Sequence, residues 1–376
     1  MINTESFLAY LQELGIMFYA GVPDSLLKEF CACLTEKIDA DHHKICANEG
    51  NAVAMAAGHY LATGSPALVY LQNSGLGNCV NPLLSLADKE VYGIPVLLLI
   101  GWRGEPGVKD EPQHIKQGRI QNNLLETMEI PYIVMDANSD DIRDSLKRML
   151  SLALELSHPV AIVVKKGSFS QYEPASQNKA PFPGLMRQRA LEIVLETMND
   201  AIVVSTTGKT SREVNEIRKE SGKQGMDFLC VGSMGHASSI ALGIALEQRA
   251  KVVICLDGDG ALLMHMGAMA LIGNSLPKNF VHIMFNNRCY ESVGGQATPM
   301  ERVNFKLLTE ALGYREYLHC ETEDELDCTL AAIHGLPGPI FLNISTIPGS
   351  RADLGRPDTT PQDNKHRFMK SLKELS

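Results

Sequence analysis

Two short polar motifs lie in the second half of the chain, each directly after a run of apolar residues. The sequence Gly-Asp-Gly occupies positions 258–260, and the pair Asn286–Asn287 follows later, so that Asp259 and Asn287 are 287 − 259 = 28 positions apart. A carboxylate and an amide oxygen are the hard donors that Mg²⁺ binds together with ligand phosphates. The glycines beside Asp259 let the backbone approach a phosphate closely. Together the motifs indicate a site for Mg²⁺ and a phosphorylated ligand.

The apolar runs around these motifs predict the elements that must hold them. Residues 252–256 and 280–285 have the composition of buried strands, and residues 261–274 have the length and apolar content of a helix. Strand, helix, strand forms a right-handed crossover between parallel strands. Both motifs then lie at the carboxyl edge of the sheet, where open α/β sheets bind ligands. The helix starting near Ala261 would direct free amides at a phosphate, and the backbone carbonyl of Cys289 could be a third metal ligand.

Each motif also has an ordinary explanation. Gly-Asp-Gly is a common turn, an Asn pair can cap a helix, and short motifs produce many false matches. The occurrence of both motifs, each after an apolar strand, favours the ligand site.

The rest of the chain alternates strand-like and helical segments in two series. In the first series the predicted strands are residues 17–21, 42–47, 67–72, 96–102, 132–135 and 160–165. The second series starts with a helix at 186–198 and continues with strands at 201–205, 228–231, 252–256, 280–285 and 340–344.

Between the two series, residues 167–184 are rich in Ser, Gln, Asn, Pro and Gly and lack an apolar period. The pattern predicts an α/β protein with two doubly wound, mostly parallel-sheet domains and no middle domain. We place these domains at residues 1–166 and 186–376, joined by a linker at 167–185.

Composition narrows the class of protein. The chain has 376 residues, of which 45% are hydrophobic and 21% charged, which suits two or three globular domains. A net charge of −10 argues against nucleic acid as a partner, so anionic ligands must be attracted by local cations, helix ends and metal. Nine cysteines without a paired framework indicate reduced thiols in the cytoplasm. No apolar run approaches the ~18 residues of a membrane span, and no signal peptide is expected.

The spacing from Gly-Asp-Gly to Asn-Asn resembles the signature of thiamine diphosphate (ThDP) enzymes. The first domain offers a matching glutamate, because Glu49 lies where a predicted strand passes into an Ala/Gly-rich helix, similar to the family's activating-glutamate motif. An acid near a helix start is also stabilised by ~0.3–1 kcal/mol, which is a purely structural explanation for Glu49. The small residues after it favour close packing against a partner surface.

Two further segments of the second domain resemble ThDP enzymes. Thr207 and Gly208 imitate the end of a Walker A loop, but that motif requires a glycine where this chain has Val203, which argues against an ATPase. By the resemblance, Thr207 and Gly208 lie near the diphosphate, the Gly232 carbonyl accepts from the cofactor's amino group, and Met234 wedges beneath the cofactor. Met234 is otherwise a flexible core residue.

The resemblance therefore implies sets of ligands for ThDP and Mg²⁺. The metal ligands are Asp259, Asn287 and Cys289. The cofactor-binding residues are Glu49, Thr207, Gly208, Gly232, Ser233, Met234, Gly258, Asp259, Gly260, Ala261, Asn287, Cys289 and Tyr290.

Segments of both domains narrow the family. Residues 21–28, 71–78, 101–107 and 111–114 resemble sulfopyruvate and phosphonopyruvate decarboxylases, and residues 348–357 resemble the phosphonopyruvate decarboxylases specifically. The resemblance covers essentially the whole chain. Sulfopyruvate decarboxylases are often split into two subunits, and larger ThDP decarboxylases insert a middle domain, whereas this chain carries two domains only.

What the resemblance implies is the decarboxylation of 3-phosphonopyruvate to phosphonoacetaldehyde and CO₂ in phosphonate biosynthesis, by a homodimer or higher homo-oligomer. The cofactor supplies the carbanion chemistry and the protein orients it. Glu49, Asp24 and His114 are the candidate catalytic residues, although Asp24 could be a turn or helix-cap residue and His114 a solvated loop residue. Ser25, Asn73 and Arg351 are the candidate substrate ligands.

Three other functions stay open. The substrate could be 3-sulfopyruvate or another 2-oxoacid, because such an enzyme needs nearly the same pocket. The chain could also be a ThDP carboligase, or a catalytically inactive nucleotide-binding module.

Overall fold

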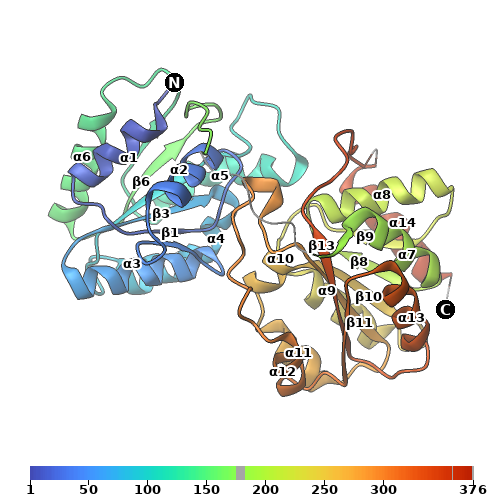
Figure 1. The fold of residues 1–376 in the computed structure, drawn as a ribbon. Coiled ribbons are helices and arrows are strands. Elements are labelled where there is room, and N and C mark those ends of the chain that lie inside the picture. The colour runs from blue at the N-terminus through green and yellow to red at the C-terminus, as the bar shows by residue number, and fades with distance from the viewer. Residues whose placement is uncertain (175–182, 358, 375–376) are drawn as a thin grey trace. The chain divides into compact units, whose positions relative to one another are not determined.

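A computed structural model describes residues 1–174, 183–357 and 359–374 of the chain. The chain divides into two compact units, Met1–Asn178 with Ser292–Pro299 and Lys179–Glu291 with Met300–Ser376 (Figure 1). Of the predicted linker, residues 175–182 lie outside the described residues, and the domain boundaries stay predictions. Among the described residues, no helix is both long and apolar enough to cross a membrane.

The first unit contains a parallel sheet with the strand order β2-β1-β3-β4-β6-β5. Its strands are β1 (Tyr19–Gly21), β2 (His43–Ile45), β3 (Ala67–Gln72), β4 (Val96–Gly101), β5 (Tyr132–Met135) and β6 (Val160–Val164). Its helices are α1 (Thr4–Glu13), α2 (Lys28–Lys37), α3 (Glu49–Thr63), α4 (Leu76–Pro82), α5 (Pro112–Thr127) and α6 (Ile142–Leu156), with short turns η1 (Asn73–Gly75) and η2 (Leu83–Ala87).

Successive strand residues point to opposite faces of this sheet, which explains why its central strands are apolar throughout. On β3, Leu68 and Tyr70 pack with α1, α2 and α6, whereas Val69 and Leu71 pack with α3, α4 and α5. Helices therefore cover both faces, and the predicted doubly wound arrangement is confirmed.

The second unit repeats this plan with the strand order β12-β13-β11-β10-β8-β9, and β7 pairs with β13. Its strands are β7 (Leu185–Met186), β8 (Ile202–Ser205), β9 (Met226–Leu229), β10 (Val253–Gly258), β11 (Phe280–Asn286), β12 (Glu316–Cys320) and β13 (Ile340–Ile347). Its helices are α7 (Arg187–Thr197), α8 (Lys209–Ser221), α9 (Ala237–Glu247), α10 (Asp259–Met264), α11 (Ala268–Ser275), α12 (Phe305–Ala311), α13 (Glu323–Ile333) and α14 (Pro361–Lys373), with a short turn η3 (Glu291–Val293).

The predicted helix at 261–274 is wrong, because the structure has two helices there. The helix α10 ends at Met264, and His265 leaves the helical conformation with φ −135° and ψ 45° before α11 begins at Ala268. The first helix also begins earlier than predicted, at Asp259. The candidate metal ligand is therefore part of the first helical turn.

Candidate active site

The two polar motifs of the second unit emerge at the same edge of its sheet. The strands β10 and β11 are parallel neighbours, with Gly258 opposite Phe285, so Asp259 and Asn287 both follow carboxyl ends. Asp259 is 3% exposed and Asn287 is 7% exposed. A Cβ atom added at Gly258 would meet no atom of the described residues within 4 Å, so there is open space at this strand end, one residue before Asp259. An aspartate and an asparagine at such an edge fit a Mg²⁺ ion that also binds phosphates.

The loop between β8 and α8 lies at this edge as well, because Ser205 on β8 pairs with Leu256 on β10. Gly208 has φ +93°, a conformation that favours glycine, and α8 begins at the next residue. The Thr206 hydroxyl is buried without a hydrogen-bond partner among the described residues. A helix N-terminus beside an unpartnered hydroxyl fits a diphosphate group.

The segment Gly232 to Gly235 packs against the helix that carries Asp259. A Cβ atom added at Gly235 would lie 3.0 Å from the Ala261 carbonyl oxygen, so only glycine allows this close approach. Ser233 has φ +57° and Gly235 has φ +85°, which turns the chain sharply at Met234. The structure thus brings the predicted cofactor loop and the predicted metal helix together.

Glu291, which was not among the predicted site residues, connects to Asn287. Its carboxylate accepts hydrogen bonds from Asn287 Nδ2 at 3.3 Å and from Lys209 Nζ at 2.7 Å, and it pairs with Arg187 at 2.9 Å. Burial alone would raise the pKa of Glu291, but these cationic partners outweigh it and lower the pKa. Its position four residues after Asn287 is the only signal the sequence offers.

Glu49 begins α3 in the first unit, where the Asn48 side chain caps the helix by accepting from the Asn51 amide. The Glu49 side chain is buried, and its Oε2 accepts a 2.7 Å hydrogen bond from Asn78 Nδ2. Burial raises the pKa of the Glu49 carboxyl, although the Asn78 bond opposes this. A Cβ atom added at Gly75 would lie 2.0 Å from Oε1, so glycine leaves the space in which the carboxylate sits.

Asp24 follows β1 and is fully buried. Its Oδ2 accepts from the Leu26 amide at 3.1 Å, while its Oδ1 has no hydrogen-bond partner among the described residues. Burial raises the pKa of the Asp24 carboxyl to about 6, against the opposing effects of backbone amides and of Arg103. A buried carboxyl that titrates near neutral pH can hold or release a proton during a reaction.

His114 lies in the first turn of α5, where Gly104 approaches its carbonyl oxygen so closely that an added Cβ atom would be 2.0 Å away. Burial and the nearby Arg103 lower the pKa of His114, so the neutral imidazole is favoured. Its Nδ1 is buried and has no hydrogen-bond partner in the described part of the chain.

Two of the three predicted substrate ligands meet at Arg103, after β4. Asn73 Nδ2 donates to the Arg103 carbonyl at 2.8 Å, and Arg103 Nη1 donates to Ser25 Oγ at 2.9 Å. Arg103 also forms a bidentate pair with Asp110. The carboxyl edge of the first unit's sheet thus carries four polar residues, which are Asp24, Ser25, Asn73 and Arg103.

Arg351, the third predicted substrate ligand, lies in the second unit and binds two acidic side chains. Its Nε and Nη2 donate to Asp353 at 2.7 and 2.9 Å, and its Nη1 donates to Glu220 at 2.5 Å. All three of its side-chain nitrogens therefore donate to a carboxylate.

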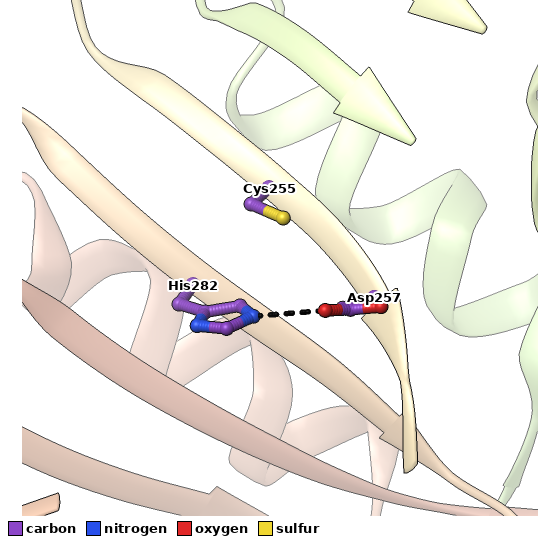
Figure 2. A group of neighbouring side chains, drawn as sticks. All are labelled: Cys255, Asp257 and His282. Carbon is purple, nitrogen blue, oxygen red and sulfur yellow. Dashed lines mark hydrogen bonds and ion pairs between the residues drawn. The ribbon is translucent and has the colours of Figure 1, made fainter. Parts of the chain in front are cut away.

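Three buried side chains form a cluster on the neighbouring strands β10 and β11, a few residues before the metal motifs (Figure 2). Cys255, Asp257 and His282 have ligand atoms within 4.8 Å of one another, a spacing that a metal ion could use. However, both His282 nitrogens have partners, Asp257 at 3.2 Å and the Tyr314 hydroxyl at 3.0 Å, and burial raises the pKa of the Cys255 thiol. Asp257, His282 and Tyr314 are better described as a hydrogen-bonded core network, beside which the buried Cys255 lies.

Comparisons with known proteins agree with this geometry. Residues 2–129 match the N-terminal TPP binding domain of thiamine pyrophosphate enzymes, and residues 206–344 match their C-terminal TPP binding domain. Thiamine pyrophosphate is another name for ThDP. The first matched segment falls in the first unit, and the second falls in the second unit apart from residues 292–299. The predicted two-domain ThDP-binding fold is confirmed.

Full-length relatives refine the assignment. A phosphonopyruvate decarboxylase of Streptomyces viridochromogenes is 34% identical over 98% of this chain and 94% of the relative, and one of Streptomyces hygroscopicus is 34% identical over 100% and 95%. A sulfopyruvate decarboxylase of Methanosarcina acetivorans is 25% identical over 98% of this chain and 97% of the relative. The chain therefore belongs to the thiamine pyrophosphate enzyme family, among its phosphonopyruvate decarboxylase-like members that are related to sulfopyruvate decarboxylase.

Proposed function

We propose that this ThDP-dependent 2-oxoacid decarboxylase converts 3-phosphonopyruvate to phosphonoacetaldehyde and CO₂, in the biosynthesis of phosphonates. The observation that carries the proposal is the 34% identity, over essentially the whole chain, to two phosphonopyruvate decarboxylases. Identity to the sulfopyruvate decarboxylase is 25% over a similar span. The Arg103 guanidinium and its neutral partner Ser25 offer one cation and one hydroxyl that could bind a small anionic substrate.

Residues of both units would hold the cofactor. When bound, ThDP supplies a nucleophilic carbon and an electron sink, which takes up the electron pair that stays behind when CO₂ leaves the substrate. Asp259, Asn287 and the Cys289 carbonyl would bind Mg²⁺. The Thr206 hydroxyl and the loop of Thr207 and Gly208 would receive the diphosphate.

The same proposal assigns roles at the other end of the cofactor. Gly232, Ser233 and Met234 would support its organic part, and Gly258, Gly260, Ala261 and Tyr290 would line the metal end. Glu49 would hydrogen-bond the aminopyrimidine ring, because its buried carboxyl has a raised pKa and can share a proton with a ring nitrogen.

Proton transfers to and from the substrate would fall to Asp24 and His114. Asp24 has a pKa of about 6, and His114 favours its neutral form, so one group can donate a proton while the other accepts one near neutral pH. Both have a buried polar atom without a partner among the described residues, which a bound substrate could satisfy.

For the phosphonate group we propose Arg103, with Ser25 and Asn73 as neutral donors, and keep Arg351 as the second candidate. Arg103 pairs with one acid, Asp110, through Nε and Nη2, and its Nη1 donates to the neutral Ser25 hydroxyl. Arg351 donates to two acids, Asp353 and Glu220, from all three of its side-chain nitrogens. A group with about two negative charges would be repelled by acids placed around its cation.

The test is decarboxylation by the purified protein with and without added ThDP and Mg²⁺, using phosphonopyruvate, sulfopyruvate and pyruvate at matched concentrations. We expect CO₂ release that requires ThDP and a kcat/KM at least about tenfold higher for phosphonopyruvate, a difference of 1.4 kcal/mol. A preference for sulfopyruvate would reassign the substrate, and acetoin-type products would reveal a carboligase. Binding of ThDP without any turnover would support an inactive module.

A further inference from the structure

Glu291 joins four segments of the second unit through one carboxylate. It contacts the loop after β11, the start of α7, the start of α8 and the loop after β13, through Asn287 Nδ2 (3.3 Å), Arg187 Nη1 (2.9 Å), Lys209 Nζ (2.7 Å) and the Gly349 amide (3.0 Å). The Glu291 side chain is 14% exposed. The two cations and the Gly349 amide hold the carboxylate in place independently of Asn287.

The neighbours of Asn287 decide which way its amide faces. Its Oδ1 accepts from the Cys289 amide at 3.2 Å, and its Nδ2 donates to Glu291 at 3.3 Å. Rotating the amide by half a turn would set Oδ1 against the carboxylate of Glu291 and the NH₂ group against the Cys289 N–H. Both contacts would then be repulsive, because a carboxylate only accepts and an N–H only donates.

We infer that Glu291 is a positioning residue, which fixes the Asn287 amide so that its oxygen, and not its NH₂ group, is offered to the Mg²⁺ ion of ThDP. This inference rests on the proposed ligand set of Asp259 and Asn287. Some residues orient a metal ligand without contacting the metal themselves. Their removal commonly weakens metal binding 10- to 100-fold.

The experiment compares substitutions that differ in one contact. Glu291→Met has a similar length but cannot accept from Asn287, whereas Glu291→Gln keeps an acceptor oxygen. The matched control is Glu213→Gln, because the Glu213 carboxylate forms a bidentate pair with Arg187 at 2.7 and 2.9 Å. Among the described residues, no hydrogen bond or ion pair joins Glu213 to Asn287.

Calorimetry gives the Kd for Mg²⁺ in the presence of ThDP, and thermal unfolding of the metal-free protein gives Tm. We expect Glu291→Met to weaken Mg²⁺ binding about 10- to 100-fold and Glu291→Gln to stay within about threefold of wild type. Glu213→Gln should lower Tm and leave the Kd unchanged. If Glu291→Met does not fold, Glu291→Asp replaces it, because its shorter carboxylate keeps the charge for the cations and withdraws from Asn287.

The inference is overturned if Glu291→Met, or Glu291→Asp in its place, binds Mg²⁺ as wild type does. The inference is also overturned if Glu213→Gln weakens Mg²⁺ binding as much as Glu291→Met does. The ion-pair network around Arg187 would then affect the metal site only through the stability of the fold. Asp259→Ala is measured alongside these variants. Unchanged Mg²⁺ binding in Asp259→Ala would disprove the proposed ligands Asp259 and Asn287, and the inference about Glu291 that rests on them. No substrate enters these measurements, so a failure of the phosphonopyruvate assignment shows only in the turnover assay.

Discussion

At the scale of single residues, Asp24 shows how burial prepares a side chain for chemistry. Its carboxyl is fully buried, and the loss of water raises its pKa from 3.8 to about 6 although amides and Arg103 oppose the change. The folded protein therefore holds a proton on Asp24 more tightly than the unfolded chain does. Ionisation of Asp24 at neutral pH therefore lowers the stability of the fold. We propose that the protein retains Asp24 despite this loss because the side chain takes part in catalysis.

This cost predicts a pH-dependent effect of Asp24→Asn on stability. Because the folded pKa is raised, the favourable effect of protonated Asp24 is complete below its ordinary pKa of 3.8 and is lost as the pH rises through about 6. The uncharged variant avoids this loss, so it should be more stable than wild type at pH 8, by at most about 3 kcal/mol.

Denaturant unfolding of the cofactor-free proteins at pH 5 and pH 8 measures this effect. The stability difference between variant and wild type should widen from pH 5 to pH 8. A difference that is the same at both values would show that Asp24 ionises as easily in the folded state as in the unfolded state.

A second residue-scale prediction concerns substrate specificity. If Arg103 binds the phosphonate, Arg103→Ala loses a charge-assisted contact of ~1.5–3 kcal/mol, or roughly 10- to 150-fold in kcat/KM for phosphonopyruvate. Pyruvate lacks the group and should be affected far less. Arg351→Ala should change either substrate by less than about threefold.

Steady-state kinetics with both substrates decide between the two cations. A selective loss in Arg351→Ala would move the phosphonate assignment to Arg351. Equal losses for both substrates in Arg103→Ala would mean that Arg103 serves the fold, through its pair with Asp110.

Motifs in the sequence predict single site residues, but they do not predict the long-range contacts of those residues. The motifs predict Asp259, Asn287 and Glu49 as candidates because each stands at a recognisable position after a strand. Neither the pairing of Arg351 with Glu220, 131 positions away, nor the four contacts of Glu291 can be seen in a local pattern. Such contacts depend on which loops the sheet brings together.

At the scale of elements, the turn η1 and the helix α4 shape the place where Glu49 lies. Gly75 has φ −85°, which any residue can adopt, yet an added Cβ atom would be 2.0 Å from Glu49 Oε1. At Gly77, in the first turn of α4, an added Cβ atom would meet no atom of the described residues within 4 Å. The two glycines therefore differ in packing and provide a matched pair.

We predict that Gly75→Ala displaces the Glu49 carboxylate and lowers kcat by about 100-fold or more, the usual size of a lost acid–base contribution. Gly77→Ala should leave kcat unchanged and slightly favour the helix, since alanine is the better helix former. Turnover with saturating ThDP and circular dichroism of each variant provide the measurements. Equal activity of both variants would mean that Glu49 has another way to accommodate the methyl group.

Elements differ in how well an apolar pattern predicts them. The strands β3 and β5 have the predicted bounds, because each is a distinct apolar run. The strand β12 was missed, since this edge strand leaves most of its side chains partly or fully exposed and so lacks an apolar run. The break between α10 and α11 was missed as well, because the residues around His265 remain apolar while the backbone leaves the helix.

At the scale of the whole molecule, a chain with a net charge of −10 must bind an anionic cofactor and an anionic substrate. The global field repels both ligands, so attraction has to come from local groups such as the amino end of α8 and the side chain of Arg103. The local groups fall into two sets, one at the sheet edge of each unit. The candidate activating group Glu49 belongs to the first unit, and the candidate metal ligands belong to the second.

Because the proposed cofactor site uses both sets, we predict that the active enzyme is at least a homodimer in which Glu49 of one chain serves the cofactor bound by Asp259 of the other. Glu49→Ala and Asp259→Ala should each be inactive alone. Mixed under conditions of subunit exchange, they should regain up to about a quarter of the wild-type activity, since random pairing makes half of the dimers mixed and gives each of these one intact site. Native mass spectrometry of differently tagged chains establishes the exchange. Full exchange without recovered activity would show that each chain completes its own site.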